Sequence, residues 1–153
     1  MDLFNKILIS RGLTTQALRQ RFLQPDYAST KYDPFLLPDM QKAVERLKQA
    51  HQKQEKIVIY GDYDIDGLSA TALLLDAFGK FGFGNVEAFI PNRFVEGYGM
   101  TIGAVDKVAA MGANLIVTVD TGSLCHAEIE YASSLGIEDR KSTRLNSSHA
   151  LAS

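Results

Sequence analysis

Three short apolar runs, each followed by a stretch with helical periodicity, limit the folds open to this chain more than any other feature. A continuous run of this length is typical of a strand that is buried on both faces of a sheet. We expect strands at 57–60, 86–90 and 115–119 and helices at 68–81, 101–111 and 123–135. Strands that alternate with helices predict an α/β fold with a doubly wound, mainly parallel sheet. Right-handed crossovers then bring the loops after the strands to one edge, where such folds bind ligands.

The rest of the chain divides into a lead-in and a tail around this domain. One or two short helices before residue 32, a proline-marked loop and a helix at 39–54 form an N-terminal helical lead-in, residues 1–55. Residues 56–137 are the expected α/β domain. From 138 to 153 the apolar rhythm is lost, and most of this tail closely resembles the in-frame translation of a sequencing-library adapter. We expect the tail to be foreign to the protein, with a natural disordered tail as the alternative.

Composition excludes several classes of protein. The single cysteine, Cys125, cannot form an internal disulfide and fits a reducing compartment, where a buried, inert thiol is its ordinary role. No apolar run approaches the roughly 20 residues that span a bilayer, and the N-terminus lacks the pattern of a signal peptide. We therefore expect a cytoplasmic protein with no membrane partner. The net charge of −2 gives no sign of nucleic-acid binding, so any such function must depend on particular residues.

The densest functional signal is the aspartate-rich turn at 61–67, directly after the first apolar run. If the backbone stays extended there, Asp62, Asp64 and Asp66 point the same way. Carboxylates held this close repel one another unless a cation compensates them, and oxygen ligands suit Mg²⁺, Mn²⁺ or Ca²⁺. An EF-hand is excluded, because its twelfth position requires Glu and Leu73 stands there, on the face expected to be buried. A solvated turn that caps a helix is the alternative.

A further aspartate, Asp120, follows the third apolar run in the same way. The first and third strands of a doubly wound sheet are often neighbours, so Asp120 is expected to approach Asp64 and Asp66. Alone, Asp120 could be the N-cap of the next helix. Two aspartate sites that meet at the ligand-binding edge favour a metal site instead. We take Asp64, Asp66 and Asp120 as candidate catalytic residues and metal ligands, and Asp62 as a further ligand.

The segment after the second strand, 91–99, has residues suited to phosphate binding. Asn92 and Arg93 follow a proline, and Tyr98 lies between two glycines that permit tight turns. Arginine with nearby backbone amides can hold a phosphate in bidentate geometry. We take Asn92, Arg93 and Tyr98 as candidate substrate-binding residues. An ion pair of Arg93 with Glu96 on the surface is the alternative.

Three stretches of the sequence match one known family. They are 58–67, 90–99 and 115–120, and from about residue 8 to 137 the chain resembles the RecJ-type single-stranded-DNA-specific exonucleases of the DHH phosphoesterase superfamily. The aspartate turn is shared across the superfamily, whereas the P-N-R-F-x-E-G-Y-G loop is more specific to the RecJ branch. The resemblance implies a two-metal phosphodiesterase that depends on Mn²⁺ or Mg²⁺ and degrades single-stranded DNA from the 5′ end. It also implies a role in DNA repair and recombination.

The resemblance assigns roles to individual residues as well. Asp64 and Asp66 match the first metal-binding motif of the family, with Asp62 beside them in the same turn. Asp120 matches the second motif and is implied to bridge or bind the metals. Arg93 is implied to lie near the 5′ phosphate or the scissile backbone.

The chain departs from the family pattern after the second motif. Thr121 and Ser123 stand where the family usually has Asn and an aliphatic residue. The Asp-His-His segment that names the superfamily does not occur, although it is expected on a fourth strand directly after residue 137. We therefore expect a truncated domain, the N-terminal fragment of an exonuclease, that is inactive as written.

Two other functions stay open. A relative within the superfamily could hydrolyse short oligonucleotides, cyclic dinucleotides or pyrophosphate, although the 91–99 loop and the long lead-in favour the exonuclease branch. A non-catalytic module that binds nucleic acid or protein is the alternative outside the enzymes, and the intact aspartates argue against it. Mn²⁺ binding distinguishes a scaffold from an enzyme, because a pure scaffold has no reason to bind the ion.

Overall fold

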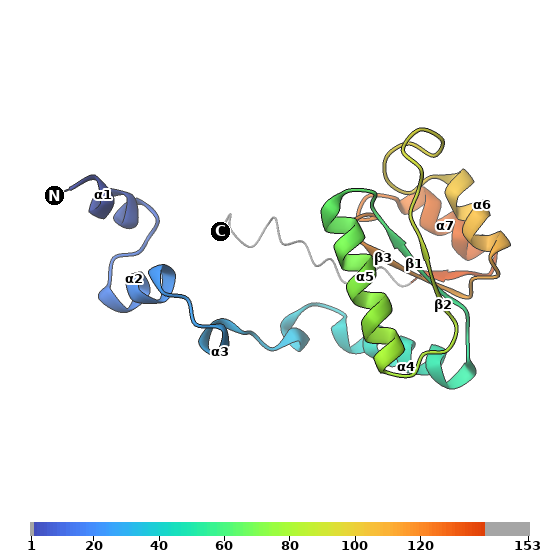
Figure 1. Ribbon diagram of the computed structural model, residues 1–153, viewed down its shortest axis with the longest axis horizontal. Helices are drawn as coiled ribbons and strands as arrows, with labels where there is room; N and C mark the ends of the chain where they lie inside the picture. The colour runs from blue at the N-terminus through green and yellow to red at the C-terminus, as the bar shows by residue number, and fades with distance from the viewer. Residues whose placement is uncertain (1, 140–153) are drawn as a thin grey trace. The chain divides into compact units, whose positions relative to one another are not determined.

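The computed structural model (Figure 1) describes residues 2–139 of the chain. The chain divides into two compact units, of which the first is Met1–Leu36 and the second begins at Leu37. This boundary differs from the one expected at residue 55. The reason is that the helix α4 (Met40–Lys53), expected in the lead-in, belongs to the unit that contains the sheet.

The first unit contains short helices: α1 (Leu3–Ser10), α2 (Gln16–Leu23), α3 (Tyr27–Thr30) and the 3₁₀ turn η1 (Pro34–Leu36). Asp2 and Thr15 cap α1 and α2, because each side chain accepts a hydrogen bond from the backbone N–H three residues ahead. Arg19 links the two helices, since its guanidinium donates to the side chain of Asn5 and to the carbonyl of Leu13. The sequence predicted one or two helices here and missed α3.

Within the described residues, the second unit is built on a parallel sheet with the order β2-β1-β3-β4. The strands are β1 (Ile57–Gly61), β2 (Val86–Phe89), β3 (Leu115–Val119) and β4 (Glu138–Asp139). β1 is an interior strand, with Ile57 opposite Val86 on one side and Leu115 on the other. The predicted parallel α/β fold is confirmed, and so is the adjacency of the first and third strands.

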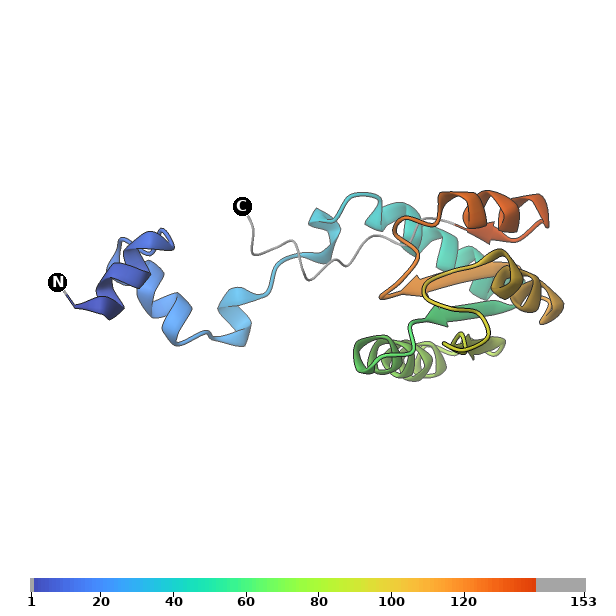
Figure 2. The ribbon, with the colours of Figure 1, turned by 90° about the horizontal axis from the view of Figure 1, so that it is seen from above.

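Helices cover both faces of this sheet, and Figure 2 shows α5 (Ile65–Lys80) and α7 (His126–Ser134) on opposite sides of the strands. Successive strand residues point to opposite faces. Val58 and Tyr60 therefore enter one core cluster with α6 (Ile102–Ala110) and α7. Ile57 and Ile59 enter the other cluster with residues of α4 and α5. Because β1 is buried along its whole length, both clusters are fixed to the strand that leads into the aspartate turn.

The helix α5 begins earlier than predicted and buries less. It starts at Ile65 instead of residue 68, and Leu73, predicted to face the core, is 70% exposed. Phe78 is buried as predicted. No helix in residues 2–139 is long and apolar enough to cross a membrane.

The end of the described chain bears on the expected tail. Glu138 and Asp139 form β4 and pair with β3, so the first two residues of the segment expected to be foreign take part in the sheet. The α/β rhythm calls for a fourth strand at this position, and the two residues of β4 occupy it although the sequence there was expected to be foreign. The rest of the predicted tail, 140–153, lies outside the described residues.

Candidate active site

The ends of β1 and β3 bring the predicted acidic residues to one edge of the sheet. In the parallel register Gly61 is opposite Val119, so Asp62 and Asp120 leave the two strands at the same level. Asp62 is buried, whereas Asp120 is exposed. The topology therefore brings two separate aspartate motifs side by side, as the sequence predicted.

The turn after β1 is a helix N-terminus and not an extended segment. Asp64 is the N-cap of α5, because its Oδ1 accepts hydrogen bonds from the backbone N–H groups of Asp66 at 3.0 Å and Gly67 at 2.9 Å. The helix therefore begins at Ile65, and Asp66 lies in its first turn. An extended backbone was expected to point Asp62, Asp64 and Asp66 the same way. This expectation is wrong, because the cap starts the helix inside the motif.

Two glycines allow α5 to start directly against β1. A Cβ on Gly67 would lie 2.5 Å from the backbone oxygen of Asp62, and a Cβ on Gly61 would lie 2.1 Å from Oγ1 of Thr71. The Thr71 hydroxyl fills this space and donates to the carbonyl of Gly67 at 2.7 Å. In the same turn, the carboxylate of Asp62 accepts a hydrogen bond from the N–H of Tyr63 at 2.7 Å. The aspartate turn is thus fixed by backbone packing.

Asp120 and Asp64 lie close enough across the strand ends for the charge of one carboxylate to act on the other. Partial desolvation, and after it the negative charges of the three aspartates in the β1 turn, raise the pKa of Asp120 above its ordinary value of 3.8. The backbone of Asp120 has a φ of 57°, in the left-handed region that few residues other than Gly, Asn and Asp adopt. The N-cap of α7 is Cys125, so Asp120 does not cap the next helix, and that alternative is excluded.

The four carboxylates suit a hard divalent cation in chemistry, although their side chains do not form a finished ligand set. Among residues 2–139, no three His, Cys, Asp or Glu side chains are placed together to hold a metal ion. Asp64 is turned onto the N–H groups of α5 instead. In the same part of the chain no lysine or arginine forms an ion pair with the four carboxylates. Negative charge is therefore gathered at this edge with no direct ion pair among the described residues, and a cation would relieve the repulsion.

Tyr63 connects the aspartate turn to the loop at 91–99. The guanidinium carbon of Arg93 lies 5.6 Å from the centre of the Tyr63 ring, in a cation–π contact. The ring of Tyr98 meets the same ring edge-on, with 6.2 Å between the centroids. Two of the three predicted substrate-binding residues are thus beside the aspartate turn. Tyr63 was not among the predicted site residues, and its one signal in the sequence was its position inside the aspartate motif.

Asn92, the third predicted substrate-binding residue, shapes the loop itself. Its Oδ1 accepts a hydrogen bond from the N–H of Phe94 at 2.9 Å, and its carbonyl accepts from the N–H groups of Val95 and Glu96. The predicted alternative for Arg93 is excluded, because Glu96 forms its ion pair with Lys107. The outer side of the loop is aromatic, and the side chain of Phe94 is 95% exposed.

The sequence and the fold both match known proteins. Residues 56–139 match the sequence model described as "DHH family, N-terminal domain", so the chain belongs to the DHH family. Its relatives include the single-stranded-DNA-specific exonuclease RecJ of Bacillus subtilis, which is 41% identical over 132 residues. That match covers 86% of this chain and 16% of the relative. RecJ of Escherichia coli is 46% identical over 101 residues, or 66% of this chain and 18% of the relative.

Two solved structures share the fold. A structure of RecJ in complex with Mn²⁺ from Thermus thermophilus superposes with a TM-score of 0.63 at 28% identity, over 86% of this chain and 17% of that one. A structure of exonuclease RecJ bound to manganese gives a TM-score of 0.62 at 35% identity, over 67% of this chain and 26% of that one. The resemblance to the RecJ branch is therefore confirmed. The chain spans about a sixth of the length of the curated relatives, at 16% and 18%.

Proposed function

We propose that this chain is the N-terminal, metal-binding part of an exonuclease that hydrolyses the phosphodiester bonds of single-stranded DNA in the 5′→3′ direction. The observation that carries the proposal is the approach of Asp120 to Asp64 at the shared edge of β1 and β3. The membership in the DHH family and the RecJ relatives support the substrate class. On this proposal the whole protein works in the cytoplasm, in DNA repair and recombination.

The cofactor we propose is Mn²⁺ or Mg²⁺, held first by Asp64 and Asp120. Asp66 and Asp62 complete the set of oxygen ligands. The manganese bound in two solved RecJ structures supports the choice of ion. Cations held by these carboxylates would supply an activated water and would stabilise the leaving oxygen. Asp64 must then turn part of its carboxylate away from the N–H groups that it now caps.

The DNA strand is proposed to lie along the loop at 91–99. Arg93 offers a fixed guanidinium for a phosphate, because its contact with Tyr63 restrains it close to the aspartate turn. Tyr98 and Phe94 offer exposed rings on which bases can stack, as in other proteins that bind single strands without reading sequence. Asn92 supports this surface by holding the turn that presents Arg93 and Phe94.

The chain as written is proposed to bind the cation without cleaving DNA. No Asp-His-His segment occurs in its 153 residues, so the ligands that this segment contributes in the family are not among them. The test is incubation of the chain with Mn²⁺ and a 3′-labelled single-stranded oligonucleotide. We expect no products above background, and efficient shortening from the 5′ end would contradict the proposal.

Calorimetry with Mn²⁺ tests the metal site directly. The wild-type chain is expected to bind the ion, and Asp120→Asn is expected to bind it at least about tenfold more weakly, because one charged ligand is lost. Asp76→Asn is the matched control, since Asp76 pairs with Lys80 on α5 and takes no part in the strand ends. Absence of Mn²⁺ binding to the wild-type chain would favour the non-catalytic module instead.

A further inference from the structure

The loop at 91–99 reverses the usual distribution of side chains between surface and interior. Its acidic residue, Glu96, has a side chain that is only 6% exposed. Its aromatic and apolar residues Phe94, Val95 and Tyr98 are 95%, 72% and 76% exposed. Charged side chains are rarely buried unless they are paired, and exposed apolar groups that lie together mark binding surfaces. The buried acid and the exposed rings therefore call for a common explanation.

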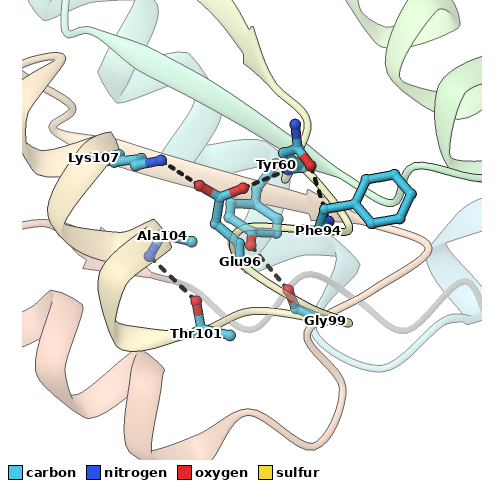
Figure 3. Close-up of polar contacts among 8 residues, drawn as sticks. Tyr60, Phe94, Glu96, Gly99, Thr101, Ala104 and Lys107 are labelled. Atoms are coloured by element: carbon cyan, nitrogen blue, oxygen red, sulfur yellow. Dashed lines mark hydrogen bonds and ion pairs between the residues drawn. The ribbon is translucent and has the colours of Figure 1, made fainter.

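Glu96 joins the tip of the loop to the neighbouring helix. One carboxylate oxygen accepts a hydrogen bond from the backbone N–H of Asn92 at 2.5 Å, and the other forms an ion pair with Nζ of Lys107 on α6. The backbone N–H of Glu96 also donates to the carbonyl of Asn92 at 2.8 Å. Figure 3 shows the carboxylate turned inward between the loop and α6, while the ring of Phe94 points away from it. One side chain thus closes the turn and attaches it to the fold.

The other end of the loop is attached to the sheet. The hydroxyl of Tyr60, a buried residue of β1, donates to the carbonyl of Gly99 at 3.0 Å (Figure 3). Two residues later Thr101 caps α6 by accepting a hydrogen bond from the N–H of Ala104 at 3.3 Å. The φ angles of Gly97 and Gly99 are both positive, which allows the chain to turn between these two attachments. The loop is therefore held at Glu96 by α6 and at Gly99 by the sheet.

We propose that Glu96, paired with Lys107, is a positioning residue that holds Arg93, Phe94 and Tyr98 in the arrangement that receives a single strand. The inference rests on the proposed function for the identity of the ligand, but the ordering of the loop can be measured without DNA. A loop that is already ordered loses less conformational entropy when it binds, so its fixation strengthens binding. Glu96 acts through the loop and contacts neither the strand nor the cation.

Three variants separate the contacts of Glu96. Glu96→Ala removes the hydrogen bond to Asn92 and the ion pair together. Glu96→Gln keeps an acceptor for the N–H of Asn92 but removes the ion pair, and Lys107→Met removes the ion pair alone. Glu87→Gln is the matched control, because Glu87 pairs with Lys56 between β1 and β2, away from the loop. In amide hydrogen exchange, Glu96→Ala should speed exchange at 92–96 by about tenfold, Glu96→Gln and Lys107→Met by less, and Glu87→Gln not at all.

Oligonucleotide binding tests the positioning role separately from overall stability. Loss of stability alone would also change Mn²⁺ affinity and the exchange rates in β1 and β3. A 5′-phosphorylated oligo(dT), titrated with Mn²⁺ present, should bind Glu96→Ala about tenfold more weakly than wild type, with Glu96→Gln between them. The affinity for Mn²⁺ alone and the exchange rates in β1 and β3 should not change. Equal exchange at 92–96 in Glu96→Ala and wild type would overturn the inference, and so would equal oligonucleotide affinity. If the wild-type chain binds no oligonucleotide, the proposed substrate is contradicted, and the exchange rates alone decide the role of Glu96.

Discussion

The turn after β1 and the loop after β2 lie beside each other, but the fold holds them in different ways. The aspartate turn is fixed by backbone packing, because Gly67 rests against Asp62 at a distance that leaves no room for a Cβ. The 91–99 loop is fixed by polar side chains, chiefly Glu96, and its glycines have open space around them. The first region gathers uncompensated charge, and the second exposes aromatic rings.

The difference indicates what each region is ready to bind. Repelling carboxylates on a rigid backbone cost stability until a cation joins them, which is the usual signature of a functional site. Exposed rings on an ordered loop reduce the stability of the fold less than repelling carboxylates do. They become buried only when a partner covers them. We therefore expect substitutions in the aspartate turn to change folding and metal binding, and substitutions in the loop to change strand binding.

The largest effect should follow a change at the glycine that fixes the aspartate turn. Gly67→Ala forces its new Cβ against the backbone of Asp62, so we expect a loss of about 3 kcal/mol in the free energy of unfolding. Gly79→Ala in the same helix has nothing within 4 Å and should stabilise the chain by about 0.5–1 kcal/mol. Urea denaturation measures both. Equal effects of the two substitutions would show that the turn is not fixed by this contact.

The charge of Asp120, beside the aspartate turn, should have the next largest effect. Asp120→Asn removes one member of the repelling cluster and keeps a residue type that tolerates the positive φ of 57°. Because Asp120 is exposed and water screens the repulsion, we expect the midpoint of thermal unfolding without metal to rise by only about 2 °C. With Mn²⁺ the order should reverse, since the ion binds wild type more tightly and therefore stabilises it more than Asp120→Asn. A lower midpoint for Asp120→Asn without metal would contradict the repulsion.

The order of the 91–99 loop should depend on pH through Glu96. Its hydrogen bond with Lys107 is the main cause that lowers the pKa of Glu96 below its ordinary value of 4.5. A lowered folded pKa means that the contribution of Glu96 is complete above 4.5 and is lost as the pH falls through the lower, folded value. Tyr60, whose hydroxyl holds the loop at Gly99, stays neutral because burial raises its pKa. Exchange at 92–96, measured from pH 5 downward and corrected for intrinsic rates, should show this loss in wild type and not in Glu96→Gln.

The smallest effect on folding is expected at the outermost ring of the loop. Phe94→Ala should change the free energy of unfolding by less than about 0.5 kcal/mol, because the side chain is 95% exposed. The same substitution should weaken oligonucleotide binding by about 1–3 kcal/mol if a base stacks on the ring. Phe94→Trp gives a direct signal, since the chain contains no other tryptophan. Fluorescence that does not change with the oligonucleotide would argue against stacking at this position.

The sequence predicted the strands well because a strand that is buried on both faces appears as a continuous apolar run. β1 and β3 are continuous apolar runs, and both lie within a residue of the expected positions. The parallel fold then followed from their alternation with helices, and the approach of Asp120 to Asp64 followed from strand adjacency. These predictions rest on regular periodicity and on the chirality of the crossovers.

The details of the site depend on contacts between distant residues, which the sequence does not record. The start of α5 at Ile65 depends on the choice of Asp64 as N-cap among three similar aspartates. The burial of the Glu96 side chain depends on its ion pair with Lys107 of α6. The sequence around Glu96 looks like an ordinary exposed loop and does not reveal this contact. Leu73 fits a helical apolar face, yet it is exposed, because periodicity predicts which residues share a face and not whether that face is covered.

The metal site is tested most directly by a crystal structure of the chain grown with Mn²⁺, with anomalous scattering measured at the manganese absorption edge. We expect an anomalous peak between the carboxylates of Asp64 and Asp120, with the Asp64 side chain rotated away from the N–H groups that it now caps. The peak should be weaker in Asp120→Asn crystals grown at the same Mn²⁺ concentration. A peak elsewhere on the chain, or none at this edge at saturating Mn²⁺, would contradict the assignment of these aspartates as the metal site.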